Sequence, residues 1–234
     1  MSASAQVLQS PDLVSVAGEK AGPQDAVLSP QGKWNPHDFA REQIRGLVRR
    51  VFVAGASPPA KQVVFSAVES HSSIAQICVQ VGQALALEAR ADIAVVNRDS
   101  GPAEMLSAHP RYAGRVAIKS WSTQIASNLW RVPESRLRES LHGSGTSLWL
   151  AGLAELRKEF EYAIIEGPAA GSSSEAALLG YLTDGIILVL GAHNTRKATA
   201  CKIKDTLEST HIRILGAILN ERRFPVPDAI YRRL

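Results

Sequence analysis

The sequence is poor in cysteine, in aromatic side chains and in long apolar runs, and each shortage excludes a class of protein. Two distant cysteines, Cys78 and Cys201, provide neither a disulfide framework nor a zinc pattern, so we expect a reducing compartment. Aromatic residues make up 6% and the net charge is +4. The basic stripe with interleaved aromatics that is typical of nucleic-acid binding is therefore missing.

No apolar run approaches the roughly 20 residues that a membrane helix needs, so we expect no membrane span. The N-terminus has no basic start followed by an apolar stretch, and we expect a cytoplasmic protein without a signal peptide. Hydrophobic residues make up 45% and charged residues 21% of the 234 residues, which is ordinary globular usage. Residues 1–34 are broken by proline and glycine and are expected to be a disordered tail, and residues 35–234 to be one domain.

From residue 35 onward, short apolar runs alternate with segments of helical periodicity. Runs of this kind form strands that are buried on both faces, as in a parallel sheet. The expected strands are 63–68, 93–96, 129–132, 162–165, 185–190 and 212–219, and the expected helices are 35–52, 74–87, 103–108, 148–160, 174–182 and 195–208. The alternation predicts an α/β fold with a doubly wound, mostly parallel sheet and helices on both faces, in three layers.

The loop at residues 69–73, after the first of these strands, is the expected anion site. In such sheets, ligands bind beyond the carboxyl ends of the strands, where helix N-termini offer unpaired N–H groups. A phosphate loop also needs glycines that adopt positive φ and a lysine. This chain has no glycine between Gly55 and Gly82 and no lysine between Lys61 and Lys119.

The hydroxyl groups of Ser70, Ser72 and Ser73 are the remaining candidates for holding a phosphate. A helix N-cap explains the same serines, so capping and weak phosphate binding are both open. His71, between them, is expected to be an exposed loop side chain and not a phosphate ligand.

Three later segments carry a family resemblance. Residues 156–168 (LRKEFEYAIIEGP), 183–189 (TDGIILV) and 215–220 (LGAILN) are similar to the segments LR-x-x-F-D-Y-V-I-I-D-T-P, A-D-G-V-I-L-V and L-G-V-V-L-N. These segments belong to the P-loop domain of bacterial capsular and exopolysaccharide tyrosine autokinases, the CpsD/CapB type of the MinD/ParA-like superfamily. The resemblance extends from about residue 40 to residue 234, and it implies a P-loop fold, MgATP as cofactor and tyrosine phosphorylation as the activity.

The departures from the family pattern fall on the chemistry. The Walker A glycines and lysine are replaced within residues 70–75, and the second acidic motif reads VNRD at 96–99, which keeps only Asp99. Glu166 stands where the family has the Walker B aspartate. The resemblance implies that Asp99 and Glu166 are catalytic and hold Mg²⁺, and that Asn220 lies near the adenine base. Two other interpretations are equally good. Asp99 and Glu166 are relics that only cap loops, and Asn220 is a residue of the turn that ends its strand.

Four other features of the sequence bear on oligomerisation, tyrosine phosphorylation, nucleophilic catalysis and metal binding. Glu42, Arg45 and Arg49 resemble the family's E-x-x-R-x-x-R oligomerisation motif with its last arginine displaced by one position, although a solvated helix face gives the same pattern. The family's tyrosine-rich tail is reduced to Tyr231. The loops at 142–145 and 167–172 lack a nucleophile elbow and are expected to be plain loops. The six histidines show no spacing that predicts a metal site.

The sequence thus favours a catalytically degenerate, kinase-like P-loop protein of capsule or exopolysaccharide assembly that acts by docking, with no MgATP turnover or only weak turnover. The lost lysine alone is expected to weaken nucleotide binding about 10²- to 10⁴-fold. The expected partners are like subunits or an intact kinase, and the cytoplasmic end of a polysaccharide chain-length membrane protein at the inner face of the membrane. The alternative is an active ATP-dependent tyrosine autokinase. A partitioning ATPase of the MinD/ParA kind is a third and weaker alternative.

Overall fold

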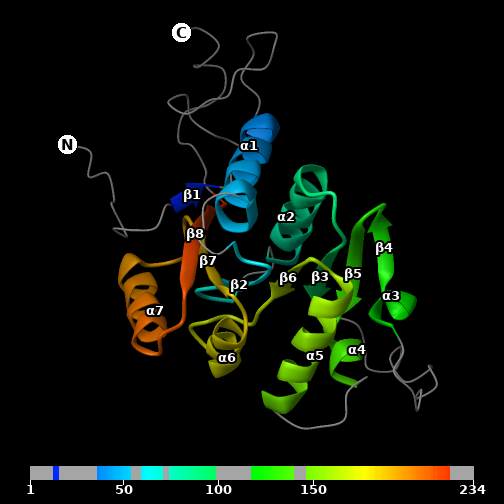
Figure 1. Cartoon of the computed structure of the whole chain (residues 1–234). Coiled ribbons are helices and arrows are strands. Elements are labelled where there is room, and N and C mark those ends of the chain that lie inside the picture. The colour runs from blue at the N-terminus through cyan, green and yellow to red at the C-terminus, as the bar shows by residue number, and fades with distance from the viewer. Residues whose placement is uncertain are drawn as a thin grey trace, which may run out of the picture.

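One sheet, built of β1 to β8, organises the part of the chain that the structure describes (Figure 1). The computed structural model describes residues 13–15, 36–53, 59–70, 74–98, 117–139 and 146–221. The strand order is β1-β8-β7-β2-β6-β3-β5-β4, and all neighbouring strands are parallel except the antiparallel pair β4 and β5. The strands are β1 Leu13–Ser15, β2 Gln62–Ala67, β3 Ile93–Asn97, β4 Thr123–Ala126, β5 Leu129–Pro133, β6 Tyr162–Glu166, β7 Gly185–Gly191 and β8 Ile214–Asn220.

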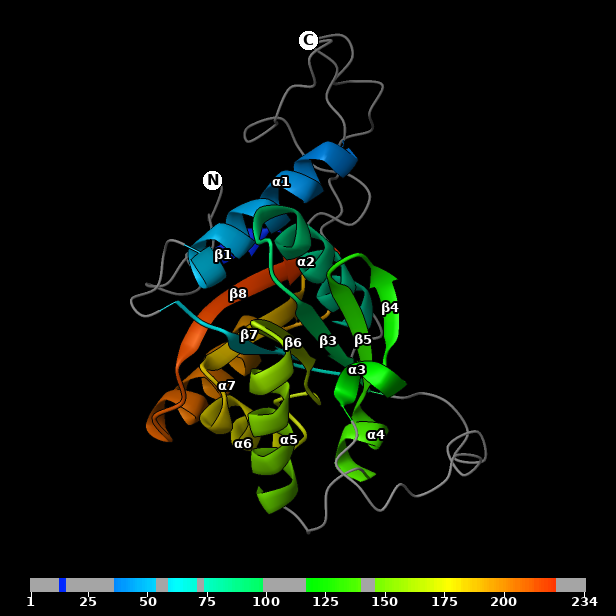
Figure 2. The same ribbon diagram turned by 45° about the vertical axis from the view of Figure 1, so that its right-hand side comes forward.

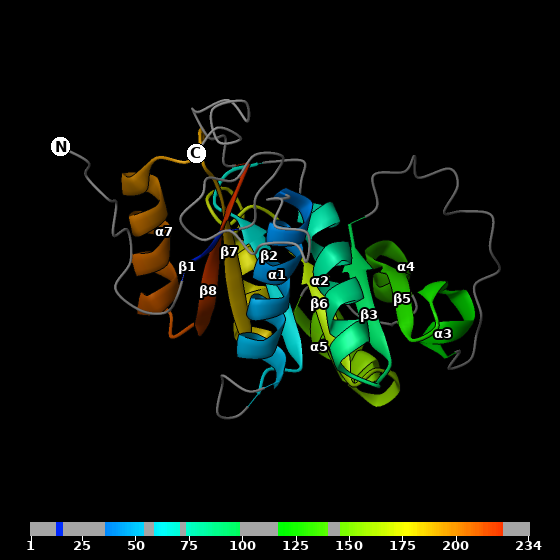
Figure 3. The same ribbon diagram turned by 90° about the horizontal axis from the view of Figure 1, so that it is seen from above.

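Helices cover both faces of the sheet, as a doubly wound α/β fold requires (Figure 3). The helices are α1 Pro36–Val48, which continues into the π-helical turn η2 Arg49–Val53, α2 Ile74–Glu88, α3 Ile118–Trp121, α4 Glu134–Glu139, α5 Thr146–Glu159, α6 Ser174–Leu182 and α7 Lys197–Ser209. Helices α1 and α2 share one hydrophobic core with one side of the sheet, and α3 to α7 share a second core with the other. The predicted three-layer fold is confirmed.

Strand β2 lies at the centre of the sheet, between β7 and β6. All six of its residues are buried, because both faces are covered and successive side chains enter opposite cores. Val63 and Phe65 belong to the core under α1 and α2, and Val64 belongs to the core on the other side. The apolar run that predicted this strand therefore contributes side chains to both cores.

The region that the sequence pattern described least well contains an antiparallel hairpin (Figure 2). Strands β4 and β5 are joined at Ser127 and Asn128, and β4 has no fully buried residue, so it shows no apolar run for the sequence to reveal. The Asn128 amide donates to the carbonyls of Ala86, Ala89 and Ala91, and so satisfies carbonyls at the end of α2. The expected helix at 103–108 lies outside the described residues.

The segment expected to be a tail contributes one described element. Strand β1 pairs in parallel with β8 at one edge of the sheet. The expected domain boundary at residues 34 and 35 lies outside the described residues and stays a prediction.

The start of β2 is fixed by a polar cluster. The Asp184 carboxylate accepts hydrogen bonds from the backbone N–H groups of Lys61 and Gln62, each at 2.7 Å, and from the Arg157 guanidinium at 2.9 Å. Arg157 also donates to the Gln62 side chain at 2.9 Å, and that side chain donates to the Leu153 carbonyl. Burial raises the pKa of Asp184, but these donors together outweigh it, so the pKa lies below its ordinary value.

We expect Asp184→Asn to lower the free energy of unfolding by about 1–2 kcal/mol at pH 7, since the amide cannot accept all of these bonds. The pKa of Asp184 is lowered by folding, so its contribution is complete above its unfolded value of about 3.8 and is lost as the pH falls through the folded pKa. The deficit of the variant should therefore shrink in acid. Urea unfolding at several pH values measures it, with the exposed Asp205→Asn on α7 as control. The same pH dependence in both variants would contradict the assignment.

Two helical glycines offer a matched test of the packing between α2 and the sheet. A Cβ at Gly82 would lie 2.7 Å from Val95 Cγ2 and 3.0 Å from Leu129 Cδ1, whereas a Cβ at Gly46 on α1 meets nothing within 4 Å. Gly46→Ala should stabilise the protein by about 0.5–1 kcal/mol through helix propensity. Gly82→Ala should destabilise it by about 1–3 kcal/mol through overpacking. Thermal or urea unfolding measures the stability of both variants. Stabilisation by Gly82→Ala would show that α2 can move away from the sheet.

Candidate functional site

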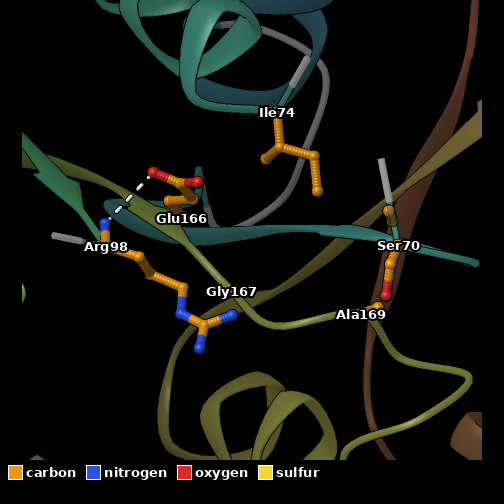
Figure 4. Close-up of a pocket in the computed structure, with 7 residues that line it drawn as sticks. Ser70, Ile74, Arg98, Glu166, Gly167 and Ala169 are labelled. Carbon is orange, nitrogen blue, oxygen red and sulfur yellow. Dashed lines mark hydrogen bonds between the residues drawn. The ribbon is translucent and has the colours of Figure 1, made fainter. Parts of the chain in front are cut away.

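The carboxyl ends of three adjacent parallel strands border a cavity of about 310 Å³. β2 ends at Ala67, β6 ends at Glu166 and β3 ends at Asn97, and α2 starts beside them. The described residues that line the cavity are Ala67, Ser70, Ile74, Arg98, Glu166, Gly167 and Ala169. Figure 4 shows Glu166 and Arg98 on one side and Ser70 beside Ala169 on the other. This is where an open α/β sheet binds its ligands.

The chain that follows β6 closes tightly against the end of β2. The backbone N–H groups of Ala170 and Gly171 donate to the carbonyls of Ala67 and Val68 at 2.8 and 3.1 Å. A Cβ at Gly171 would lie 2.4 Å from the Val68 oxygen, so only glycine permits this approach. The Val68 N–H donates to the carbonyl of Val189 on β7. The beginning of the loop after β2 is thus held by protein groups on both sides.

Glu166 brings a negative charge into the cavity at the end of β6. Its Oε2 accepts a hydrogen bond from the backbone N–H of Arg98 at 3.1 Å, which joins the ends of β6 and β3. Cys78 lies on α2, and its pKa is raised first by burial and then by the negative charge of Glu166. A thiol with a raised pKa is a poor nucleophile, so Cys78 is best understood as a core residue.

Arg98 is the residue of this cavity that the sequence did not single out. Its side chain reaches from the end of β3 towards Gly167 (Figure 4). The guanidinium Nε lies 3.6 Å from Glu134 Oε2, and half of the side chain is exposed. A contact of 3.6 Å exceeds a hydrogen bond, so this ion pair is loose. Arg98 is thus a cation that faces the cavity on a fixed backbone.

Glu134, the resting partner of Arg98, belongs to a wider polar network. Its carboxylate also accepts from Arg138 at 3.1 Å, and Arg138 donates to Glu175 at 3.3 Å. Glu175 in turn accepts from the indole N–H of Trp149 at 3.0 Å. Burial raises the pKa of Glu134, against the opposing effect of its two arginines. The network ties the edge of the cavity to α4, α5 and α6.

The structure brings together some of the residues predicted from the sequence. Ser70 and Glu166 line the cavity. Asn220 ends β8 at the same edge of the sheet, but it is not among the residues that line the cavity. The other predicted site residues, Ser72, Ser73 and Asp99, and also His71, lie outside the described residues, so their roles stay predictions. The sequence signal for Arg98 is its position directly after a buried strand, in the same VNRD segment as Asp99.

A magnesium–nucleotide complex fits the described part of the cavity poorly. Mg²⁺ prefers several oxygen ligands in octahedral geometry, and the described lining supplies one carboxylate, whose Oε2 already accepts a hydrogen bond. A guanidinium in the same cavity repels a divalent cation. Elsewhere among the described residues, no group of three or more His, Cys, Asp or Glu side chains is placed to hold a metal ion.

The arginines of the predicted oligomerisation motif have a partner within the chain. Arg45 and Arg49 of α1 both contact the carboxylate of Glu88 at the end of α2, at 3.4 and 2.9 Å, and Arg45 also pairs with Glu42 at 3.0 Å. These side chains are half-exposed to solvent, so the pairs are weak individually. They join α1 to α2 at its C-terminal end.

No helix in the described ranges has the length and the apolar character needed to cross a lipid bilayer.

Comparison with known proteins finds similarity of sequence over one short region and similarity of fold over most of the chain. No family model matches the chain. Tyrosine-protein kinase YwqD of Bacillus subtilis is 32% identical over 79 residues, which are 33% of this chain and 33% of that protein. The aligned region thus spans about a third of the curated relative.

Solved structures extend the likeness to most of the chain. The chimerical protein CapA2B2 superposes with a TM-score of 0.61 at 18% identity, over 92% of this chain and 95% of that one. The kinase domain of the Escherichia coli tyrosine kinase ETK gives a TM-score of 0.59 at 15% identity, over 80% and 78%. The MinD cell division protein of Aquifex aeolicus gives 0.51 at 15% identity, over 74% and 72%.

Identities this low establish a shared fold, and the resemblance seen in the sequence is confirmed at that level. The chain has the fold of bacterial tyrosine kinase domains and MinD/ParA-like ATPases, and over 79 residues it is similar in sequence to a bacterial tyrosine kinase.

Proposed function

We propose that the chain is a degenerate, tyrosine-kinase-like P-loop protein of capsule or exopolysaccharide assembly, which acts as a regulatory or docking partner with no ATP turnover or only weak turnover. The kinase-like fold and the 79-residue similarity to a tyrosine kinase support the family assignment. The composition of the loop after β2 supports the loss of activity.

That composition is the observation that carries the proposal. The loop joins β2 to α2, the place where this fold binds phosphate, yet no lysine occurs between Lys61 and Lys119 and no glycine between Gly55 and Gly82. Non-glycine residues in a positive-φ cradle cost about 1–3 kcal/mol each, and the missing lysine removes charge-assisted bonds. The cavity contains Arg98 instead, which discourages the magnesium ion that the reaction needs.

Docking is the role that remains open to such a scaffold. The proposed partners are like subunits or an intact kinase, together with the cytoplasmic end of a polysaccharide chain-length membrane protein, which would bring the protein to the inner face of the membrane. The α1 face with Arg45 and Arg49 is the surface we propose for like subunits. When a like subunit docks there, Arg45 and Arg49 have to share their contact with Glu88 with that subunit or give it up.

The alternative function is an active ATP-dependent tyrosine autokinase with a rearranged phosphate cradle. The carboxylate of Glu166 and the hydroxyl of Ser70, which both line the cavity, are the features that favour it. In that case Glu166 and Asp99 hold Mg²⁺.

Calorimetric titration with MgATP distinguishes the two functions. We expect a dissociation constant in the millimolar range or weaker, about 10²- to 10⁴-fold above a micromolar site, because the lysine and the glycines are missing. Incubation with radioactive ATP should leave the tyrosines of the purified protein unlabelled.

Glu166→Ala is the diagnostic variant, and Glu208→Ala on α7, far along the chain from the cavity, is its control. Micromolar binding that Glu166→Ala abolishes and Glu208→Ala preserves would establish the autokinase in place of the docking protein.

A further inference from the structure

We propose that the outer surface of α5 and α6 is a dimer interface, on which a second copy of this chain packs its own α6 antiparallel about a two-fold axis. This surface, the α5–α6 face, consists of Leu150, Ala151 and Ala154 of α5 with Ala177, Leu178 and Tyr181 of α6. It lies on the opposite side of the sheet from the α1 arginines. The proposal therefore goes beyond the docking surface named for the proposed function.

The first argument is the composition of α6. Of its nine residues, SEAALLGYL, only Glu175 is charged at neutral pH. Its carboxylate is already engaged, because it accepts from the indole N–H of Trp149 at 3.0 Å and from Arg138 at 3.3 Å. A helix that is apolar on every side is normally buried on every side. Ala176 and Leu179 bury one side of α6 in the domain, so the other side lacks the cover that its composition requires.

The second argument is the exposure of apolar side chains on two neighbouring helices. The side chain of Tyr181 is 69% exposed and that of Leu150 is 51% exposed, and both are large. Ala177 and Leu178 are half-buried one turn before Tyr181, on the same side of α6. Helices α5 and α6 lie side by side (Figures 1 and 2). Their exposed apolar groups therefore adjoin one another.

The third argument is a comparison with α7, which covers the same side of the sheet. The exposed positions of α7 include the charged residues Lys197, Lys202, Asp205 and Glu208. Charges of this kind are typical of a helix face that stays in contact with water. The α5–α6 face has none among its six residues. The absence of charge is thus a property of this face and not of the whole helical layer.

Charge favours a second copy as the occupant. In a contact about a two-fold axis, both molecules use the same residues, so a charge close to the axis meets a like charge. A face without charges avoids that repulsion. The small side chains of Ala154 and Ala177 also let two helices approach closely, with large neighbours such as Leu178 filling the space beside them.

The polar group of Tyr181 has a partner in the same arrangement. If Ala177 of one α6 lies opposite Leu178 of the other in an antiparallel pair, then Tyr181 lies opposite Ser174. Ser174 is exposed, and its hydroxyl can accept from the phenol O–H. Antiparallel helices also bring the negative end of one macrodipole beside the positive end of the other. The α5–α6 face is therefore self-complementary in shape, polarity and dipole.

The experiment is sedimentation equilibrium of the full chain at concentrations from about 1 to about 100 μM, the range in which a micromolar dimer dissociates. The wild type should dimerise with a micromolar dissociation constant, because a helix pair with its flanks buries less than the roughly 1,600 Å² of a standard interface. Tyr181→Glu should raise the dissociation constant at least about 10-fold, because it places an unpaired charge in the contact.

Two control variants separate this face from other surfaces. Ala198→Glu adds the same charge at an exposed position of α7 and should leave the dissociation constant unchanged. Arg49→Glu reverses a charge on the α1 side of the sheet and should also leave it unchanged.

Cross-linking provides a second measurement that leaves the apolar face intact. Ala177→Cys is made in a Cys201→Ser chain, in which the remaining native cysteine, Cys78, is buried. A short bismaleimide should join two Ala177→Cys chains, since the axis passes next to that position. Ala198→Cys in the same background is the control and should stay monomeric in the denaturing gel.

Several results would overturn the proposal. They are a monomer at every concentration, an unchanged dissociation constant in Tyr181→Glu, and equal cross-linking of Ala177→Cys and Ala198→Cys. If circular dichroism shows that Tyr181→Glu does not fold, Leu150→Glu replaces it, with the same expected weakening. A dimer that Arg49→Glu dissociates and Tyr181→Glu does not would place the contact on the α1 side and refute the α5–α6 face.

The proposed function and this inference fail separately. Tight MgATP binding with labelled tyrosine overturns the docking role, whether or not the chain dimerises. A monomeric chain overturns the α5–α6 dimer and leaves an intact kinase or a membrane protein as docking partner.

Discussion

The Asp184 carboxylate holds the first residues of β2, and the geometry of the cavity depends on that attachment. β2 is the central strand, and two backbone N–H groups at its start have the same carboxylate as their acceptor. At the other end, the chain after β6 bonds to the carbonyls of Ala67 and Val68. With both ends fixed and both faces buried, β2 cannot slide against β6 or β7. The backbone of Ala67 and Val68 at its carboxyl end is therefore fixed relative to β6 and β7.

The charges that the structure describes around that end fit a magnesium–nucleotide complex poorly. Glu166 is oriented by a backbone N–H from the next strand, and Arg98 directs its guanidinium into the same space. Among the described lining residues, one carboxylate stands beside one guanidinium, and this pair attracts a divalent cation weakly. A kinase-like fold with this pair of charges in the described part of its cavity agrees with the docking role that we propose.

The sequence predicted those elements that have a strong local signature. Runs such as 185–190 are apolar because both faces are buried, and the period of α2 follows its contact with the sheet. Strand β4 escaped prediction because its side chains are exposed and its pairing with β5 comes from backbone bonds, which leave no trace in the composition.

The candidate site was predicted only in part for a related reason. Glu166 and Ser70 were identifiable from their positions after buried strands. The role of Arg98 depends on where its side chain turns and on Glu134, which lies 36 positions away in the sequence at the start of α4. The pairing of Arg157 with Asp184 is equally non-local. Such contacts follow from the assembled topology, and no residue pattern along the chain reports them.

Helix α2 connects the rim of the cavity to the ion pairs between α1 and Glu88. Its 15 residues form a rod about 22 Å long, with Ile74 at the rim of the cavity and Glu88 between the arginines of α1. A packed helix moves as a rigid body, so a tilt imposed at one end is transmitted to the other. If a ligand at the rim and a partner at the arginines both shift α2, thermodynamic linkage requires each to change the affinity of the other by the same factor.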